Sequence, residues 1–250
     1  MNALEAIHPL DPIIVVLNRP QEVVNIGAVV RAMKNMGISH LRLVRPEPFT
    51  GDEILRVAHR CDDIIDRMTI HDQLDDALAD TNYVIGTAAI AHHKRPQTND
   101  IRGLAQDIHR RAHHYHPYRV ALLFGQEDDG LDNHALDRCH LVAMLPSNPA
   151  YPALNLAQSV LLFLYEIRMA AGSALSPAEP SPDPVATQAE LEQLFNLSEE
   201  ALTTLDFFRY SPEVVIRTLR QMTYRMGLRS AEAKLLLAIL RKLITTQQGK

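Results

Sequence analysis

Apolar and polar residues follow one another along this chain in a pattern that predicts parallel strands separated by helices. Apolar runs rich in Ile and Val are typical of strands in a sheet that helices cover on both faces. Such runs occur at residues 13–17, 41–44, 83–85, 120–124 and 142–145. Helical spacing of apolar residues predicts helices at 26–36, 52–61, 73–79, 101–114 and 156–171. Residues 1–172 are therefore expected to form an α/β domain around a parallel sheet.

The pattern changes after Gly172. Residues 173–188 contain four prolines and no apolar period, which predicts a semi-rigid linker. Beyond the linker, helical spacing returns at 189–197, 199–208, 212–226 and 230–245. This C-terminal module, residues 189–250, is too short for a robust core of its own, so we expect it to dock on its own body or on a second subunit.

The composition is that of an ordinary globular protein, with 46% apolar and 22% charged residues. The N-terminus has no signal-peptide pattern, and no apolar run approaches the ~18 residues of a membrane span, so we expect a cytoplasmic protein without membrane contact. Cys61 and Cys139 are too few for a disulfide framework or a zinc site. The histidines at 109–116 lack complementary ligands and are read as a solvated helix end, so no metal is expected.

Charge is distributed unevenly along the chain. Residues 209–250 hold nine Lys or Arg and two Asp or Glu, a net +7, so the remainder of a chain with net charge −5 carries −12. A basic tail attracts phosphate, which would give oriented and salt-dependent binding to nucleic acid. A helical face whose cations are merely solvated explains the same charge equally well.

Three separated segments carry the most specific information. They are N-I-G-A-V-V-R at 25–31, L-F-G-Q-E-D-D-G-L at 123–131 and L-P-S-N-P-A-Y-P-A-L-N at 145–155. Each joins Gly, Pro or Asn to polar groups next to an apolar run, which is how strand ends become ligand sites. Asn25 and Asn155 are expected to cap helices. No G-x-G-x-x-G or P-loop pattern occurs, which argues against dinucleotide or P-loop chemistry.

Arg31 interrupts an apolar stretch, so its guanidinium must reach water or find an anion. A snorkelling surface arginine and a pair with Glu127 are the simplest alternatives.

In their order and spacing, the three segments resemble the knotted SPOUT RNA methyltransferases, and specifically the branch that methylates ribose 2′-hydroxyls with S-adenosylmethionine. The resemblance implies a parallel sheet with helices on both faces, a trefoil knot near 145–155, and a homodimer. It places Asn25, Arg31, Glu127 and Asn155 in catalytic positions, with Arg31 orienting an RNA phosphate. It implies S-adenosylmethionine as the methyl donor, with S-adenosylhomocysteine as the product. The residues that it implies as cofactor contacts are Thr87, Ala88, Ala89, Gly125, Gln126, Gly130, Leu145, Pro152, Ala153 and Leu154.

Ala153 departs from the family pattern, because many members carry a serine there. Any hydrogen bond made by that hydroxyl would fall to Asn155, Tyr151 or water.

The tail segment L-D-F-F-R-Y-S-P-E-V-V-I-R-T-L-R-Q-M at 205–222 resembles the helical extension of the tRNA (cytidine/uridine-2′-O)-methyltransferase branch. This implies tRNA as the substrate and the first nucleotide of the anticodon loop, C or U, as the target. Candidate RNA contacts are Tyr151, Lys94, Arg95, Arg217, Arg220 and Arg225. A ribosomal RNA 2′-O-methyltransferase and a catalytically silent knotted RNA-binding protein are the alternatives.

Overall fold

The computed structural model describes residues 10–92, 95–115, 117–172, 183–209 and 211–248. Within them, seven strands form one sheet in the order β3-β2-β1-β6-β4-β7-β5. All paired strands are parallel, which confirms the predicted sheet. The strands are β1 (Ile13–Asn18), β2 (His40–Val44), β3 (Thr69–His71), β4 (Tyr83–Thr87), β5 (Gln97–Thr98), β6 (Val120–Phe124) and β7 (Leu141–Ala143).

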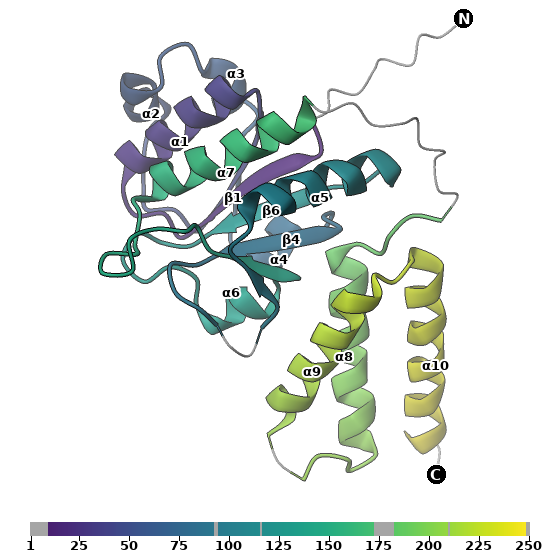
Figure 1. Ribbon diagram of the computed structural model, residues 1–250. Coiled ribbons are helices and arrows are strands. Elements are labelled where there is room, and N and C mark those ends of the chain that lie inside the picture. Colours follow the sequence, from purple (N-terminus) through teal and green to yellow (C-terminus); the bar gives the residue numbers. More distant parts are fainter. Residues whose placement is uncertain (1–9, 93–94, 116, 173–182, 210, 249–250) are drawn as a thin grey trace, which may run out of the picture.

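Helices cover both faces of this sheet (Figure 1). The long helices α1 (Val23–Met36), α5 (Ile101–His114) and α7 (Leu156–Ala171) share one face with α2 (Gly51–Val57) and α3 (Asp62–Ile65). The short helices α4 (Leu74–Leu78) and α6 (Asn133–Asp137) cover the other face. Alternation along β1 sets the two cores: Ile13, Val15 and Leu17 pack on the first face, and Ile14 and Val16 on the second.

The first turns of α1 and α7 decide where two asparagines point. Asn155 caps α7 as predicted, because its side-chain oxygen accepts from the N–H groups of Ala157 and Gln158. The prediction that Asn25 caps α1 was wrong, since α1 starts at Val23 and its N-cap is Glu22. Asn25 is the third residue of the helix, so its side chain is available for other contacts.

The C-terminal module consists of α8 (Gln188–Thr204), α9 (Pro212–Met226) and α10 (Ser230–Gln248). Its small core includes Leu194, Phe195, Ile216 and Leu237. The prediction of two helices at 189–208 was wrong, because α8 is continuous through Ser198. The Ser198 hydroxyl donates to the Leu194 carbonyl within the helix, so it does not interrupt the backbone. No described helix has the length and apolar content that crossing a membrane requires.

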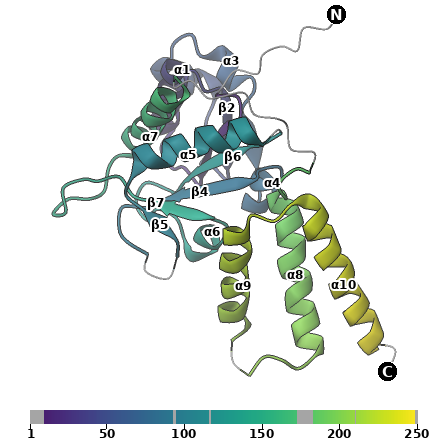
Figure 2. The ribbon, with the colours of Figure 1, turned by 45° about the vertical axis from the view of Figure 1, so that its right-hand side comes forward.

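The module docks on its own body, one of the two options that the sequence left open (Figures 1 and 2). The N–H groups of Gln188 and Ala189 donate to the carbonyls of Thr81 and Ala79, just before β4. Tyr224 of α9 stacks on His140, with ring centroids 4.0 Å apart. Burial, with a smaller contribution from Arg111, lowers the pKa of His140 to about 3, so the ring is neutral. The module therefore sits at the amino-terminal ends of β4 and β7.

Candidate functional site

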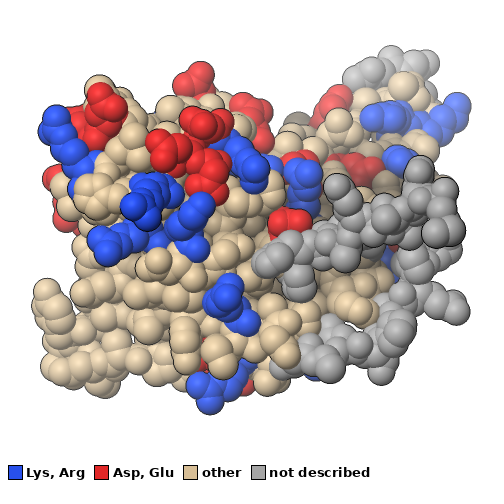
Figure 3. All heavy atoms as spheres, turned by 90° about the horizontal axis from the view of Figure 1, so that it is seen from above, with Lys and Arg blue, Asp and Glu red and all other residues tan. Residues whose placement is uncertain are grey.

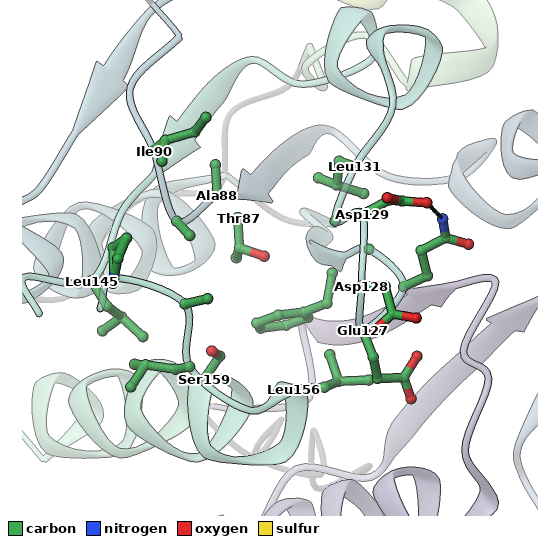
Figure 4. A pocket seen from close by; sticks show the side chains of 18 of the residues that line it. Thr87, Ala88, Ile90, Glu127, Asp128, Asp129, Leu131, Leu145, Leu156 and Ser159 are labelled. Atoms are coloured by element: carbon green, nitrogen blue, oxygen red, sulfur yellow. Dashed lines mark hydrogen bonds between the residues drawn. The ribbon is translucent and has the colours of Figure 1, made fainter. Parts of the chain in front are cut away.

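A pocket opens where β4, β6 and β7 end, at the carboxyl edge of the sheet (Figure 4). Its volume is about 310 Å³, within the range of small-molecule sites. Three segments distant in sequence form its walls, from 87–92, 124–131 and 145–163. All ten residues predicted to hold a cofactor line this strand-end pocket: Thr87, Ala88, Ala89, Gly125, Gln126, Gly130, Leu145, Pro152, Ala153 and Leu154. Their role as cofactor ligands stays a prediction.

The turn from Gly125 to Gly130 brings backbone to the pocket wall. A Cβ at Gly125 would lie 2.0 Å from the Gly130 carbonyl carbon, so only glycine fits there. Gly130 itself has φ +67°, a conformation that favours glycine. Its N–H donates to the Gln126 carbonyl at 3.0 Å, closing the turn. The two glycines thus fold the segment tightly against itself and expose main-chain groups to a ligand.

Glu127 joins this turn to the start of α1. Its carboxylate accepts from the N–H groups of Gln21 and Glu22, at 3.0 and 3.2 Å, and from the Asn25 amide at 2.9 Å. Asn155 then donates its amide to the Asn25 side-chain oxygen at 2.9 Å. Partial burial acts to raise the pKa of Glu127, but these hydrogen bonds outweigh it and the pKa is lowered. Three of the four predicted catalytic residues therefore form one network around an ionised carboxylate.

Arg31, the fourth, stands apart from this network. It does not line the strand-end pocket, and no ion pair joins it to Glu127, whose described partners are Gln21, Glu22 and Asn25. Of the two alternatives that the sequence left open, a surface arginine is found and the pair with Glu127 is not, because six residues of helix rotate a side chain roughly 120° away from Asn25. Arg31 lies instead on the exposed face of α1, which it shares with Val24, a side chain that is 58% exposed.

Three of the predicted RNA-binding arginines are engaged within the protein. Arg95, 10% exposed, pairs with Asp137 at 2.8 Å, and Arg217 pairs with the same carboxylate at 3.1 Å. Arg220, 9% exposed, forms a two-pronged pair with Glu192 of α8. These contacts join the module to itself and to the body, so the expectation that Arg95 and Arg220 face RNA is corrected.

Of the remaining predicted RNA contacts, two are exposed on the surface and one is not described. Arg225 is exposed and Tyr151 is 77% exposed, so both are accessible to a large ligand. Lys94 lies outside the described residues.

Ser159 is a pocket residue that the sequence analysis missed. It lines the cavity and its hydroxyl faces the open space (Figure 4), where it makes no hydrogen bond to any described residue. Its position, one helical turn after Asn155, was the available signal, because residues four apart share a helix face. Phe124 and Phe163, packed edge to face 5.8 Å apart, contribute apolar surface to the same pocket.

Comparison with known proteins gives matches over the segments that form this site. The SpoU rRNA Methylase family model matches residues 12–165, which include all three glycine- and proline-rich segments. The tRNA (cytidine/uridine-2'-O-)-methyltransferase TrmJ of Klebsiella pneumoniae is 32% identical over 251 residues, covering 96% of this chain and 100% of the relative. The TrmJ of Pectobacterium atrosepticum is 34% identical, covering 92% of this chain and 96% of that protein.

Solved structures agree with these relatives. The crystal structure of TrmJ from Z. mobilis ZM4 superposes with a TM-score of 0.79 at 29% identity, covering 92% of this chain and 98% of that one. A probable methylase family protein from Haemophilus influenzae Rd KW20 gives a TM-score of 0.60 at 29% identity, covering 95% and 97% of the two chains. At these coverages the similarity extends into the C-terminal module.

Proposed function

The chain belongs to the SpoU rRNA methylase family, and from that membership we propose that it transfers a methyl group from S-adenosylmethionine to a ribose 2′-hydroxyl of tRNA. One observation carries the choice of tRNA. The similarity to tRNA (cytidine/uridine-2'-O-)-methyltransferases spans at least 92% of this chain in each of the two relatives described, so it includes the module as well as the catalytic body. The target within tRNA is proposed to be the first nucleotide of the anticodon loop. Loop nucleotides are unstacked and reachable, which suits enzymes acting on RNA.

The strand-end pocket suits this methyl donor. The Gly125–Gly130 turn presents main-chain donors and acceptors, and Leu145, Leu156 and Phe124 present apolar surface of the kind that holds an adenine ring. When bound, S-adenosylmethionine supplies an activated methyl group, so the protein needs only to position the ribose hydroxyl and stabilise charge developing on it. We propose that the segment at 145–155 threads through the preceding chain as in the knotted relatives.

Glu127 is assigned to positioning. Its lowered pKa makes it a weak proton acceptor at neutral pH. The carboxylate instead fixes the 21–22 loop and Asn25 against the donor turn. Arg31 remains protonated and is proposed to orient the RNA phosphate and stabilise the developing alkoxide.

Because Arg31 lies outside the pocket of its own chain, we propose that it acts on RNA held by a second copy. Exposed apolar side chains form a stripe along α7, made of Leu161, Leu162, Tyr165 and Met169. The view from above, the side on which α1 and α7 lie in Figure 1, includes a broad area without charged side chains (Figure 3). A homodimer that buries this face would place the exposed face of α1, with Arg31, beside the partner's pocket.

The direct test is methylation of bulk tRNA and, in a parallel reaction, of ribosomal RNA by the purified protein with labelled S-adenosylmethionine, followed by mapping of the modified nucleotide. We expect one ribose-methylated pyrimidine at the start of the anticodon loop. Label found only in ribosomal RNA, or failure of the donor to bind in calorimetry, would overturn the proposal. Replacement Arg31→Ala should abolish transfer while leaving donor affinity unchanged, since its role begins only when RNA is bound.

Mixing of variants tests action across the dimer. In a mixed dimer, the Arg31→Ala subunit keeps an intact pocket and the Gly125→Ala subunit keeps an intact Arg31. These two parts form one working site only if the arginine acts across the interface. Random mixing should then recover roughly a quarter of the wild-type activity. If Arg31 acts within its own chain, no activity returns.

A further inference from the structure

A second cavity, of about 240 Å³, lies at the same edge of the sheet, beyond β1 and β2. No predicted catalytic or cofactor residue lines it. We call it the arginine groove, and its polar lining consists of Asn18, Arg19, Arg45, Gln73, Asp132 and His134. Arg19 directly follows β1 and Arg45 directly follows β2, so two adjacent parallel strands each end in an arginine that borders one cavity.

Both arginines adopt left-handed backbone conformations. Their φ angles are 56° for Arg19 and 45° for Arg45, values that cost a non-glycine residue ~1 kcal/mol or more. Hydrogen bonds hold these strained ends, because the N–H of Arg19 donates to the Val44 carbonyl and that of Arg45 to the His71 carbonyl. Gly or Asn would satisfy this backbone at lower cost. The presence of arginine at both positions therefore points to a use for the side chains.

The guanidinium charges are only partly compensated. Arg19 approaches Asp132 at 3.8 Å, with both side chains 49% exposed, a separation too long for a hydrogen bond. Arg45 donates to the Asp72 carbonyl and, at 2.8 Å, to the Gln73 side-chain oxygen, both neutral acceptors. Among the residues that line the groove, two arginines thus face one carboxylate, with His134 beside them. This excess of positive charge in a cavity suits an anion.

The groove and the strand-end pocket are bordered by adjoining segments of the chain. Residues 18 and 19 border the groove, while the N–H groups of Gln21 and Glu22 bind Glu127 of the donor turn. In a second segment, residues 127–131 line the pocket and Asp132 and His134 line the groove. An RNA strand lying along this edge would place a phosphate over the groove while a nearby ribose faces the pocket.

We propose that the arginine groove binds a phosphodiester group of the RNA substrate, close to the ribose that is methylated. The inference rests on the proposed function, and it adds a contact that the three motif segments do not contain. Arg19 and Arg45 are planar donors that match phosphate oxygens in pairs. The contact is to backbone phosphate, so it positions the RNA without reading its sequence.

The test compares charge removal inside and outside the groove. Asn tolerates left-handed backbone, so the double variant Arg19→Asn, Arg45→Asn removes both cations without adding strain. Arg60→Asn is the control for losing an exposed cation from a left-handed position, because Arg60 is exposed, has φ 60° and lies outside the groove; each single groove variant is compared with it. Affinity for tRNA is measured between 50 and 200 mM salt, and donor affinity by calorimetry; thermal unfolding verifies that each variant is folded.

The double variant should bind tRNA about tenfold more weakly, and its plot of log affinity against log salt should be shallower by ~1. Donor affinity should not change, and the control should match wild type throughout. Equal tRNA affinity and salt slope in double variant and control would overturn the proposal. Inorganic phosphate that competes with tRNA equally strongly in wild type and in the double variant would also overturn the proposal, since the anion would then bind outside the groove.

Failure of the proposed function has a different signature. If wild type binds tRNA but transfers no methyl group, the enzymatic assignment falls, whereas the groove is still judged by the salt slopes.

Discussion

Replacement of Gly125 by alanine tests whether the donor turn shapes the strand-end pocket. The added Cβ would lie 2.0 and 2.1 Å from the carbonyl carbon and oxygen of Gly130 and 2.4 Å from the Leu131 nitrogen. All three are backbone atoms, so no side-chain rotation can relieve the overlap. The two ends of the turn, 125–126 and 130–131, must therefore separate by more than ~1 Å to restore ordinary contact distances. That movement breaks the bond between the Gly130 N–H and the Gln126 carbonyl.

Gly130→Ala separates this overlap from simple backbone strain. Nothing lies within 4 Å of a Cβ at Gly130, but its φ of +67° makes alanine cost ~1–2 kcal/mol of stability. We expect this control to unfold at a lower temperature yet to keep most of its donor affinity. Gly125→Ala should lose donor affinity about tenfold, equivalent to ~1.4 kcal/mol, and turnover about 100-fold, because reacting groups displaced by 1 Å lose that much.

The assay is calorimetry with S-adenosylmethionine, alongside single-turnover methylation and thermal unfolding of the same preparations. If Gly125→Ala binds the donor as tightly as wild type, the turn does not form the donor site. If the two variants lose equal affinity, strain rather than the backbone overlap explains the loss, and the geometric argument fails.

Three further predictions follow from the structure. Ser159→Ala should weaken donor binding several-fold in calorimetry, and adding Ala153→Ser should restore it; unchanged affinity would show that the Ser159 hydroxyl is idle. Glu192→Gln leaves Arg220 buried without its anion, so urea unfolding should show a loss of ~3 kcal/mol, and a smaller effect than that of an exposed pair would refute the reasoning. The pKa of His140 is lowered to about 3 in the folded protein. Below pH ~6.5 the unfolded chain therefore binds a proton at His140 that the folded protein does not bind, so the free energy of unfolding should fall by ~2 kcal/mol at pH 5. His140→Gln should flatten that pH dependence, and an unchanged profile would assign it to another group.

Periodicity recovered the elements that are long and apolar. The bounds of α5, α7 and α9 match the predicted helices, because each has a clear apolar face and a capping or N-terminal proline signal. β3, β5, α3 and α6 were missed. β5 has two residues and α6 five, and β3 is an edge strand whose Thr69 and Ile70 are exposed. None of these segments contains enough repeats of apolar and polar positions to indicate a helix or a strand.

The pocket was easier to predict than the fate of the arginines. Gly125, Pro152 and Asn155 impose local backbone shape, and local shape is encoded by neighbouring residues. A guanidinium instead takes whichever anion the tertiary fold brings near. Arg220 pairs with Glu192, which is 28 residues away in sequence, and only the packing of α9 on α8 determines that pair. Charge in the tail therefore overstated how many cations are available to RNA.

The excess of acidic residues in the body does not oppose RNA binding at the sheet edge. Screening limits exposed charges to ~8–10 Å, so local balance decides. Several acidic side chains are already paired: Asp75 with Arg138, Asp80 with Arg42, and Asp107 with Arg111. In the arginine groove the balance is positive. Orientation of RNA toward the methyl donor thus depends on where cations stay uncompensated, a property that the net charge of −5 conceals.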